Sequence, residues 1–442
     1  MVVTTGYSAP LNLQTENAST RQTSITQPEL NHQLMTKRLV VKFGGSSLAD
    51  RGRIERAAAL IAKECKKGTK LVVVVSAIGK TTEELINLVN HSDKSPNKTD
   101  LDDVLAMGER TSVRVFATAL KGQGLDAKYF DPSDPDWPII TDDEFSNANP
   151  IVELCVQRVR DHVLPMLDGG TVPVIAGFVG LSTSGRVSTI GRGGSDTTAF
   201  ILARGIGADE VVLVTDAEGI LSADPKLIPG ARRLDSIDVK TLIGLADSGT
   251  KFIHRKALRY KDPNIPVRVI SHRNDDLDAE GTIITGSVFN EVEVSFESTT
   301  PTMSVTLAGR GISENPEIIS EISESIKKHS TLNGLSADFD SVIVYVPQEF
   351  SAALLPAIHD VVMRHGEAIA MAVQRDLAFI RIKGVGLEDT PGIIGKMSTL
   401  LRETGINISG MLTLASSILV FVSWDDKEQA LNLMKRVVKE SI

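Results

Sequence analysis

Apolar runs of strand length alternate with helix-like segments from Leu39 to about residue 288, and this alternation constrains the fold most strongly. The runs are continuous rather than alternately polar: LVVKF, KLVVVVSAI, VPVIAGFVG, EVVLVTD and IPVRVIS. Strands that are apolar on both faces are typical of a parallel sheet with helices on both sides. The sequence therefore predicts a three-layer αβα domain with a mostly parallel sheet over residues 36–288.

The rest of the chain follows a different order of elements, and this order occurs twice. Residues 300–373 predict strand, helix, strand, strand, helix, strand, and residues 374–442 predict the same order without the last strand. A repeat of about 70 residues indicates two small modules of βαββαβ, ferredoxin-like type. The segment EVEVSFE at 291–297 is expected to supply the missing strand, so that the modules interlock.

Composition disfavours several classes of protein. The net charge of −9 argues against nonspecific nucleic-acid binding, and no apolar run approaches the ~18 residues of a membrane span. Cys65 and Cys155 lie in helix-like segments without metal or disulfide spacing, which fits a cytoplasmic location. Residues 1–35 are rich in Ser, Thr, Asn and Gln and predict a disordered tail. A transit peptide is the less favoured alternative, because arginine is scarce there.

A dense glycine cluster occurs in VSTIGRGGSDTTAF at residues 187–200. Glycines allow the backbone to approach a ligand, and Ser195 or Asp196 is expected to cap the helix that follows. A helix N-terminus beside Arg192 favours an anion, since arginine binds a carboxylate or phosphate through two parallel hydrogen bonds. The alternative is a glycine-rich turn whose arginine is only solvated.

A second glycine-containing turn follows Lys42 in VVKFGGSS. Backbone N–H groups of Gly44, Gly45 and Ser46 are expected to surround phosphate oxygens, with the lysine supplying positive charge. The spacing of a P-loop is absent from the sequence, and the one segment near a dinucleotide fingerprint, GVGLEDTPG, has Asp389 in place of the third glycine. A dehydrogenase is therefore disfavoured.

Further polar residues follow strand ends or turns. Thr215 and Asp216 end one strand, and ligands of open α/β sheets bind at such ends. Asp224-Pro225-Lys226 predicts a turn that presents Lys226, and Lys251 follows a predicted helix. Either lysine taken alone is more simply a solvated one.

Glu109 and Arg110 are neighbours in a helix-like segment. They form either an ion pair on the helix surface or a site where the Glu109 carboxylate receives a substrate ammonium. The sequence alone leaves both interpretations open.

Seven ordered motifs resemble the aspartate kinases of the amino acid kinase family: KFGGSS, GERTSV, IITDDEFSNANP, AGFVG, TIGRGGSDTTA, VTDAEGILSADPK and GTKFIH. The C-terminal repeats resemble paired ACT domains. The resemblance implies transfer of phosphoryl from ATP to the side-chain carboxylate of L-aspartate, giving 4-phospho-L-aspartate for lysine, threonine and methionine synthesis. It also implies Mg²⁺ bound to the nucleotide, and the sequence leaves open whether protein carboxylates bind this ion as well. The alternatives are another amino acid kinase or a non-catalytic amino-acid sensor.

The same resemblance implies roles for single residues. Lys42 would stabilise the transferring phosphoryl group, and Asp196 would orient Lys42. Arg192 would bind a substrate carboxylate and Glu109 the α-ammonium, in a pocket lined by Ser76, Phe178 and Ser195. The nucleotide would contact Lys42, Gly44, Gly45, Ser46, Thr215, Asp216, Leu221, Lys226, Lys251 and Phe252.

The chain departs from the family pattern in several places. Ser46 replaces a threonine, His254-Arg255 replaces His-Pro, and Leu221 stands where many members carry tyrosine. The first module has AGRGISENPEII in place of a D-x-P-G turn, so feedback by an amino acid at the ACT modules is expected to be altered or absent. Open strand edges in the modules predict a homodimer or higher homo-oligomer.

Overall fold

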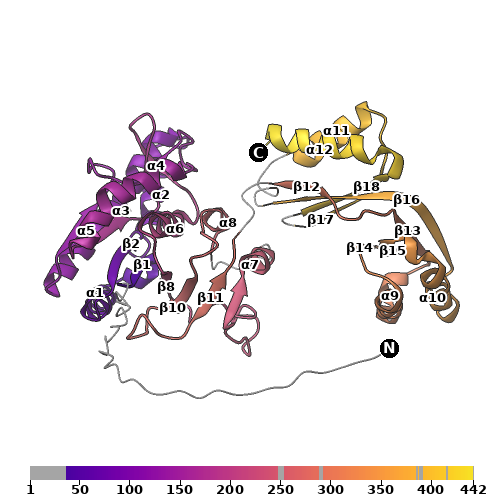
Figure 1. The fold of residues 1–442 in the computed structure, drawn as a ribbon, viewed down its shortest axis with the longest axis horizontal. Coiled ribbons are helices and arrows are strands. Elements are labelled where there is room, and N and C mark those ends of the chain that lie inside the picture. The colour runs from indigo at the N-terminus through magenta and orange to yellow at the C-terminus, as the bar shows by residue number, and fades with distance from the viewer. Residues whose placement is uncertain are drawn as a thin grey trace, which may run out of the picture. The chain divides into compact units, whose positions relative to one another are not determined.

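The structure is a computed structural model of the 442-residue chain. It describes residues 36–246, 253–287, 292–384, 387, 392–414 and 417–441. The tail expected at residues 1–35 lies outside these ranges. Within them, no helix is both long enough and apolar enough to cross a membrane. By their sheets, the described residues divide into an N-terminal part, 36–287, and a C-terminal part, 292–441 (Figure 1).

The described residues of the N-terminal part form an eight-stranded sheet with the order β3-β5-β2-β1-β8-β10-β11-β9. Neighbouring strands from β3 to β10 are parallel, and β11 is antiparallel to β10. β1, β2, β5 and β8 are buried along most of their length, which explains their continuous apolar sequences. The strands are β1 (Arg38–Phe43), β2 (Lys70–Val75), β3 (Ala127–Phe130), β5 (Val172–Ala176), β8 (Glu210–Thr215), β9 (Ser236–Asp238), β10 (Val267–Ser271) and β11 (Thr282–Thr285).

Helices cover both faces of this sheet, as the sequence predicted. α1 and α3 pack on each other and on β2, whereas α6 packs on β1, β2 and β8 and contacts α4 and α8. Right-handed crossovers between parallel strands place these two groups on opposite faces. The helices are α1 (Arg51–Lys66), α2 (Thr81–Ser92), α3 (Lys98–Gly122), α4 (Val152–Arg158), α5 (Leu164–Asp168), α6 (Gly194–Ile206), α7 (Val239–Ala246) and α8 (Arg255–Leu258).

One strand prediction in this part was wrong. The run VPVIAGFVG forms two strands: β5 in the large sheet and β6 (Val179–Ser182) in a three-stranded sheet with β4 (Ile140–Thr141) and β7 (Val187–Thr189). The chain turns at Phe178, whose φ of 68° interrupts the extended backbone. Uniform apolarity does not reveal where a chain leaves one sheet for another, because both strands are buried.

The C-terminal part contains the predicted order of strands and helices around a seven-stranded sheet. Its strands are β12 (Glu293–Phe296), β13 (Thr302–Ala308), β14 (Gly334–Ala337), β15 (Ser341–Pro347), β16 (Ala370–Lys383), β17 (Ile408–Leu414) and β18 (Ser417–Ser423). Its helices are α9 (Pro316–His329), α10 (Ser351–Arg364), α11 (Ile393–Glu403) and α12 (Lys427–Ser441).

The two repeats share a strand, which the sequence did not predict. The segments AIAMAV and LAFIRIKG, expected as separate strands, are the two halves of β16. The first half pairs with β13, and the second half pairs with β18 and with β12. Polar residues 374–376 resemble a boundary in the sequence, but they remain within the strand and only shift its register.

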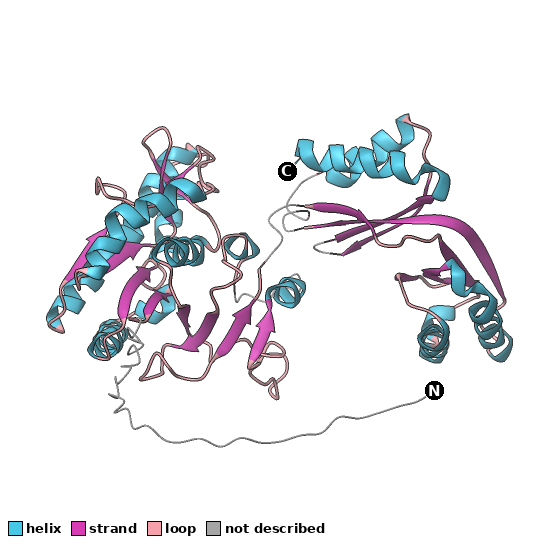
Figure 2. Ribbon diagram, in the orientation of Figure 1, coloured by secondary structure: helices cyan, strands magenta, loops and turns pink. Residues whose placement is uncertain are grey.

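Each repeat buries its strands under its own helices. One apolar core lies beneath α9 and α10, and a second lies beneath α11 and α12. Figure 2 shows these helix pairs on opposite sides of the strands. Tyr345 of β15 stacks on Phe421 of β18 with ring centroids 3.7 Å apart, so aromatic packing joins the two repeats.

Candidate functional site

The parallel strands β1, β2, β5 and β8 end at one edge of the large sheet. The strand register aligns Phe43 with Val75 and Val214, and Val75 with Ala176. The residues that follow these strand ends therefore lie along the same edge. They are the sequence-predicted residues Gly44, Gly45 and Ser46 after β1, Ser76 after β2, Phe178 after β5, and Thr215 and Asp216 at the end of β8.

A charged pair lies at this edge. The Lys42 Nζ atom of β1 is 2.7 Å from the Asp196 Oδ1 atom, and the two side chains are 16% and 11% exposed. Asp196 is in the first turn of α6, which packs on β1. Because both groups are largely removed from water, their attraction is stronger than that of a surface pair. The pair supplies a fixed ammonium one residue before the strand end.

The cap of α6 differs from the prediction that Ser195 or Asp196 would cap it. The N-cap is Gly193, with a φ of 77° that residues with side chains rarely adopt. A Cβ atom at Gly193 would also lie 2.6 Å from the Cβ atom of His254. With a glycine cap, Asp196 is free to pair with Lys42, and Ser76 Oγ donates to Ser195 Oγ at 2.9 Å.

The turn after β1 is held closely against its neighbours. The Gly44 N–H donates to the Val214 carbonyl at 3.2 Å, and Ser47 Oγ donates to the same oxygen at 3.1 Å. A Cβ atom at Gly45 would lie 2.6 Å from the Ala77 carbonyl oxygen, so only glycine fits there. Since the N–H groups of Gly44 and Ser47 are already bonded, the donors of this turn left for a phosphate are those of Gly45 and Ser46.

Glu109 has a buried carboxylate, and one of its two oxygens has no hydrogen-bond partner among the described residues. The residue is 3% exposed, its Oε1 accepts from the Ala77 N–H at 3.1 Å, and its Oε2 has no hydrogen-bond partner among the described residues. Burial raises the pKa of Glu109 to about 7. The alternative of a Glu109–Arg110 ion pair is wrong, because Arg110 pairs with Asp131 instead. Adjacent residues of a helix point in different directions.

The turn between β5 and β6 carries backbone strain at the same edge. Phe178 has a φ of 68°, which is rare for a residue with a large side chain. A Cβ atom at Gly194, the first residue of α6, would lie 2.9 Å from the Phe178 Cα atom. Strained residues of this kind are enriched at ligand sites. The geometry places Phe178 against the start of the helix that carries Asp196.

The other sequence-predicted residues form few contacts with the site residues above. Arg192 is exposed and forms no hydrogen bond or ion pair with the part of the chain that the structure describes. Thr215 Oγ1 donates to Asp216 Oδ1 at 3.0 Å. Leu221 is half-buried, and Lys226 is exposed on a turn closed by Asp224. Lys251 and Phe252 lie outside the described residues.

Sequence reasoning missed two charged residues near Arg192, Asp102 and Lys256. Asp102 is completely buried and accepts hydrogen bonds from Ser146 and Thr189. It lies seven residues before Glu109 on α3, and this spacing puts both carboxylates on one helix face. That spacing was the available signal. Nothing in the sequence near Lys256 marks it.

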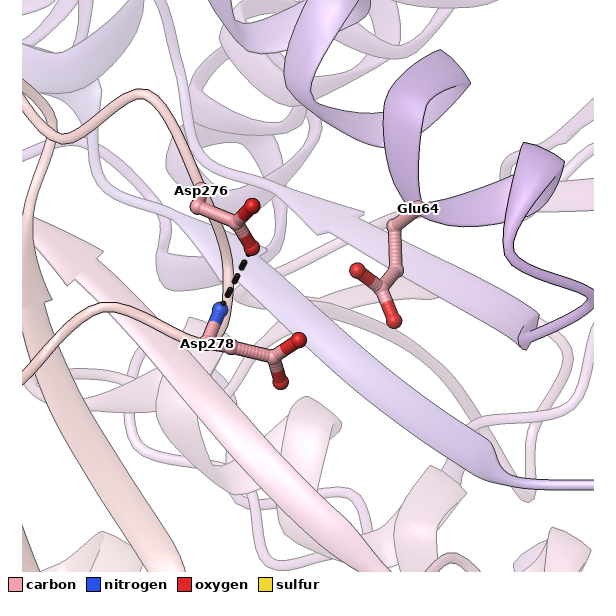
Figure 3. A group of neighbouring side chains, drawn as sticks. All are labelled: Glu64, Asp276 and Asp278. Atoms are coloured by element: carbon pink, nitrogen blue, oxygen red, sulfur yellow. Dashed lines mark hydrogen bonds between the residues drawn. The ribbon is translucent and has the colours of Figure 1, made fainter.

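Three carboxylates form an acidic cluster elsewhere in the N-terminal part: Glu64, Asp276 and Asp278 (Figure 3). The Lys67 Nζ atom lies within 2.8–2.9 Å of an oxygen of each. The lysine ammonium therefore occupies the place that a cation would take. Glu64 also bonds Thr69, and Asp278 pairs with Lys37, so the cluster lies where β1 and β2 begin. That edge is opposite the one with Lys42 and Asp196.

Comparisons with known proteins find matches for both parts of the chain. A model of the amino acid kinase family matches residues 37–271, and an ACT domain model matches residues 372–436. An aspartokinase from Thermus thermophilus is 32% identical over 403 residues, which cover 89% of this chain and 96% of the relative. The solved aspartate kinase from Synechocystis has a TM-score of 0.74 at 25% identity, covering 91% of this chain and 69% of that chain. Escherichia coli aspartokinase III, solved with aspartate and ADP, has a similar fold, with a TM-score of 0.51 at 22% identity over 91% of this chain and 100% of that chain.

Proposed function

This chain belongs to the amino acid kinase family and, within it, to the aspartokinases, and from that membership we propose how its residues perform the reaction. The enzyme transfers the γ-phosphoryl group of ATP to the side-chain carboxylate of L-aspartate, giving 4-phospho-L-aspartate and ADP. The site along the ends of β1, β2, β5 and β8 carries out this transfer. The observation that carries the proposal is the buried Lys42–Asp196 pair at that edge.

In the transfer step, a carboxylate oxygen of aspartate forms a bond to the γ-phosphorus as the bond to the β,γ-bridging oxygen breaks. No proton is transferred, because the attacking group is already a carboxylate. Negative charge spreads over the γ-phosphoryl oxygens in the transition state, and positioning and charge neutralisation are the main means of catalysis. The Lys42 ammonium supplies that neutralisation, and Asp196 holds it in place through the 2.7 Å ion pair.

Two charged groups orient the substrate. Besides the side-chain carboxylate that is phosphorylated, aspartate carries an α-carboxylate and an α-ammonium. Arg192, exposed beside the N-terminus of α6, binds the carboxylate through parallel hydrogen bonds. The Oε2 atom of Glu109, which has no hydrogen-bond partner among the described residues, accepts a hydrogen bond from the substrate ammonium. Ser76, Ser195 and Phe178 line the pocket between them.

The nucleotide binds at the same edge of the sheet, next to the aspartate pocket. The N–H groups after Gly44 bind phosphate oxygens, and Thr215, Asp216, Leu221 and Lys226 contact the rest of ATP. Mg²⁺ arrives with ATP as part of the substrate and neutralises its phosphate charge. Lys251 and Phe252 belong to the same proposal on the strength of their motif alone.

We further propose that residues 36–288 are the catalytic domain, and that 300–373 and 374–442, with the strand from 291–297, are two ACT modules that regulate it. The regulatory ligand is an amino acid. In the first module the loop N–H of Gly311 donates to Asp340 Oδ1 at 3.3 Å, and that of Gly309 to the Asp340 carbonyl at 3.0 Å. These internal bonds occupy donors that a ligand carboxylate would need, which fits altered regulation at this loop.

The modules are expected to make the protein a homodimer. Residues 370–376 of β16 pair with β13 on one side only among the described strands, and an open edge favours pairing with another chain. Light scattering is expected to show a dimeric fragment 289–442 and a monomeric fragment 1–288. A dimeric fragment 1–288 together with a monomeric fragment 289–442 would reverse the proposal.

The reaction is tested by incubating the full chain with MgATP and L-aspartate in the presence of hydroxylamine, which converts an acyl phosphate to a hydroxamate. We expect aspartyl hydroxamate to form in step with ADP, and neither product with glutamate or N-acetylglutamate. Aspartate binding without either product would instead support a non-catalytic sensor.

A further inference from the structure

Two chain segments meet beside Arg192. One is Ser146-Asn147-Ala148, before α4, and the other is Thr189-Ile190, which leads into Gly191 and Arg192. They are joined directly by the Ala148 N–H, which donates to the Thr189 carbonyl at 2.9 Å. Gly191 packs so closely on Asn147 that a Cβ atom there would lie 2.9 Å from Asn147 Oδ1. The position of Arg192 therefore depends on how these two segments are held.

The donor groups of both segments converge on one carboxylate. Asp102 accepts from the N–H groups of Ser146 and Thr189, each at 2.8 Å. It also accepts from Thr189 Oγ1 at 2.7 Å and Ser146 Oγ at 3.1 Å. Asp102 thus ties the segments to α3, the helix that carries Glu109.

The acceptor groups of both segments converge on one ammonium. Lys256 Nζ, from α8, lies 2.7 Å from the Ile190 carbonyl oxygen and 2.9 Å from that of Ala148. The Asn147 carbonyl and Oδ1 oxygens are each 2.8 Å away. These four oxygens outnumber the three hydrogens of an ammonium, so they surround it as they would a bound cation.

We propose that Lys256 is a positioning residue for aspartate binding, whose ammonium acts as a built-in cation that sets the segment carrying Arg192. The proposal rests on the function proposed above for Arg192. The Ile190 carbonyl that Lys256 binds is two residues before Arg192, so loss of the ammonium releases the segment on that side. The four oxygens would then face one another without a positive charge, which favours their separation.

The surroundings of Lys256 support this role. Burial lowers the pKa of Lys256 to about 8, because removal from water disfavours the charged form. Asp142 acts in the opposite direction, and Arg259 adds to the lowering. Among the described residues, the Lys256 ammonium bonds only residues 147, 148 and 190 and not Lys42 or Asp196, so its effect is expected on aspartate binding rather than on the transfer step.

The test compares Lys256→Ala with Lys261→Ala in the full chain. Lys261 is a matched control: it is buried and binds the carbonyls of Asp262 and Gly286, away from Arg192. We expect Lys256→Ala to raise both KM and the calorimetric Kd for aspartate about tenfold to a hundredfold, the range of a lost charged hydrogen-bond network. We expect KM for ATP to change less than threefold, and Lys261→Ala to leave the aspartate constants unchanged.

Chemical rescue separates positioning from a general loss of stability. Methylammonium, ethylammonium or n-propylammonium is expected to restore aspartate affinity to Lys256→Ala, because each supplies N–H donors and charge to the four oxygens. Tetramethylammonium, which has charge but no donor, should not restore it. An unchanged aspartate Kd in Lys256→Ala, or an equal rise in Lys261→Ala, would overturn the proposal. Wild-type protein that binds aspartate without turnover would instead contradict the proposed reaction and leave the Kd comparison valid.

Discussion

Replacing Lys42 with alanine is expected to lower kcat about 10³-fold while changing the KM values for ATP and aspartate only slightly. The Lys42 ammonium stabilises the negative charge that develops on the phosphoryl group in the transition state. One preorganised donor of this kind raises kcat by about 10²–10³-fold. The fold should be retained, because Lys42 is not part of the apolar core, although the largely buried Asp196 loses its partner and the melting temperature is expected to fall. Steady-state kinetics with both substrates checks this result.

Lys70→Ala is the matched control for this experiment. Lys70 is also a lysine of the central sheet in an ion pair of 2.7 Å, with Asp168, but it lies at the beginning of β2, at the opposite edge. Its kcat is expected to be within twofold of wild type. A Lys42→Ala enzyme with near-normal kcat would remove the basis for placing phosphoryl transfer at this edge.

Replacing Glu109 with glutamine is expected to lower kcat/KM for aspartate about a hundredfold at pH 8, because a buried ammonium of the substrate would lose its charged partner. In the wild type, kcat/KM for aspartate should rise as the pH increases through about 7, the pKa of Glu109. The sign follows from the binding form: protonated Glu109 is neutral and cannot pair with an ammonium. A pH profile in which the variant lacks this step checks the assignment.

Glu109 also affects thermal stability, which falls over the pH range in which kcat/KM for aspartate rises. The folded-state pKa of Glu109 is raised from 4.5 to about 7, so its contribution to stability is fully present below about 4.5 and is lost as pH rises through 7. Glu109→Gln should therefore melt several degrees higher than wild type at pH 8 and near wild type at pH 5. A variant that is less stable at pH 8 and retains the wild-type pH profile would contradict the role of this carboxylate.

The sequence was sufficient for most of the fold. Continuous apolar runs and helical periodicity predicted the layers of the N-terminal part and the order of elements in the C-terminal repeats, because both patterns report burial directly. Departures occurred where a change in polarity, or its absence, does not mark the end of an element. VPVIAGFVG is apolar across the turn at Phe178, and β16 continues through polar residues that resemble a boundary.

The residues alone predicted the glycine-containing turns of the candidate site but not the contacts between its side chains. Glycine turns after β1 and before α6 indicated where phosphate and carboxylate would bind. The pairing of Lys42 with Asp196 was expected from the family resemblance and not from the residues themselves, because it joins elements about 150 residues apart in the sequence. Asp102 and Lys256 were missed because their partners, which are both backbone and side-chain groups, lie in segments distant in the sequence.

The most direct test of the central claim is a crystal structure of the full chain with L-aspartate and a non-hydrolysable ATP analogue bound together. The account predicts that Arg192 binds a carboxylate of aspartate and Glu109 its ammonium, with the other carboxylate facing the γ-phosphoryl group within reach of Lys42 Nζ. Aspartate bound away from the ends of β1, β2, β5 and β8, or a γ-phosphoryl group distant from Lys42, would contradict it.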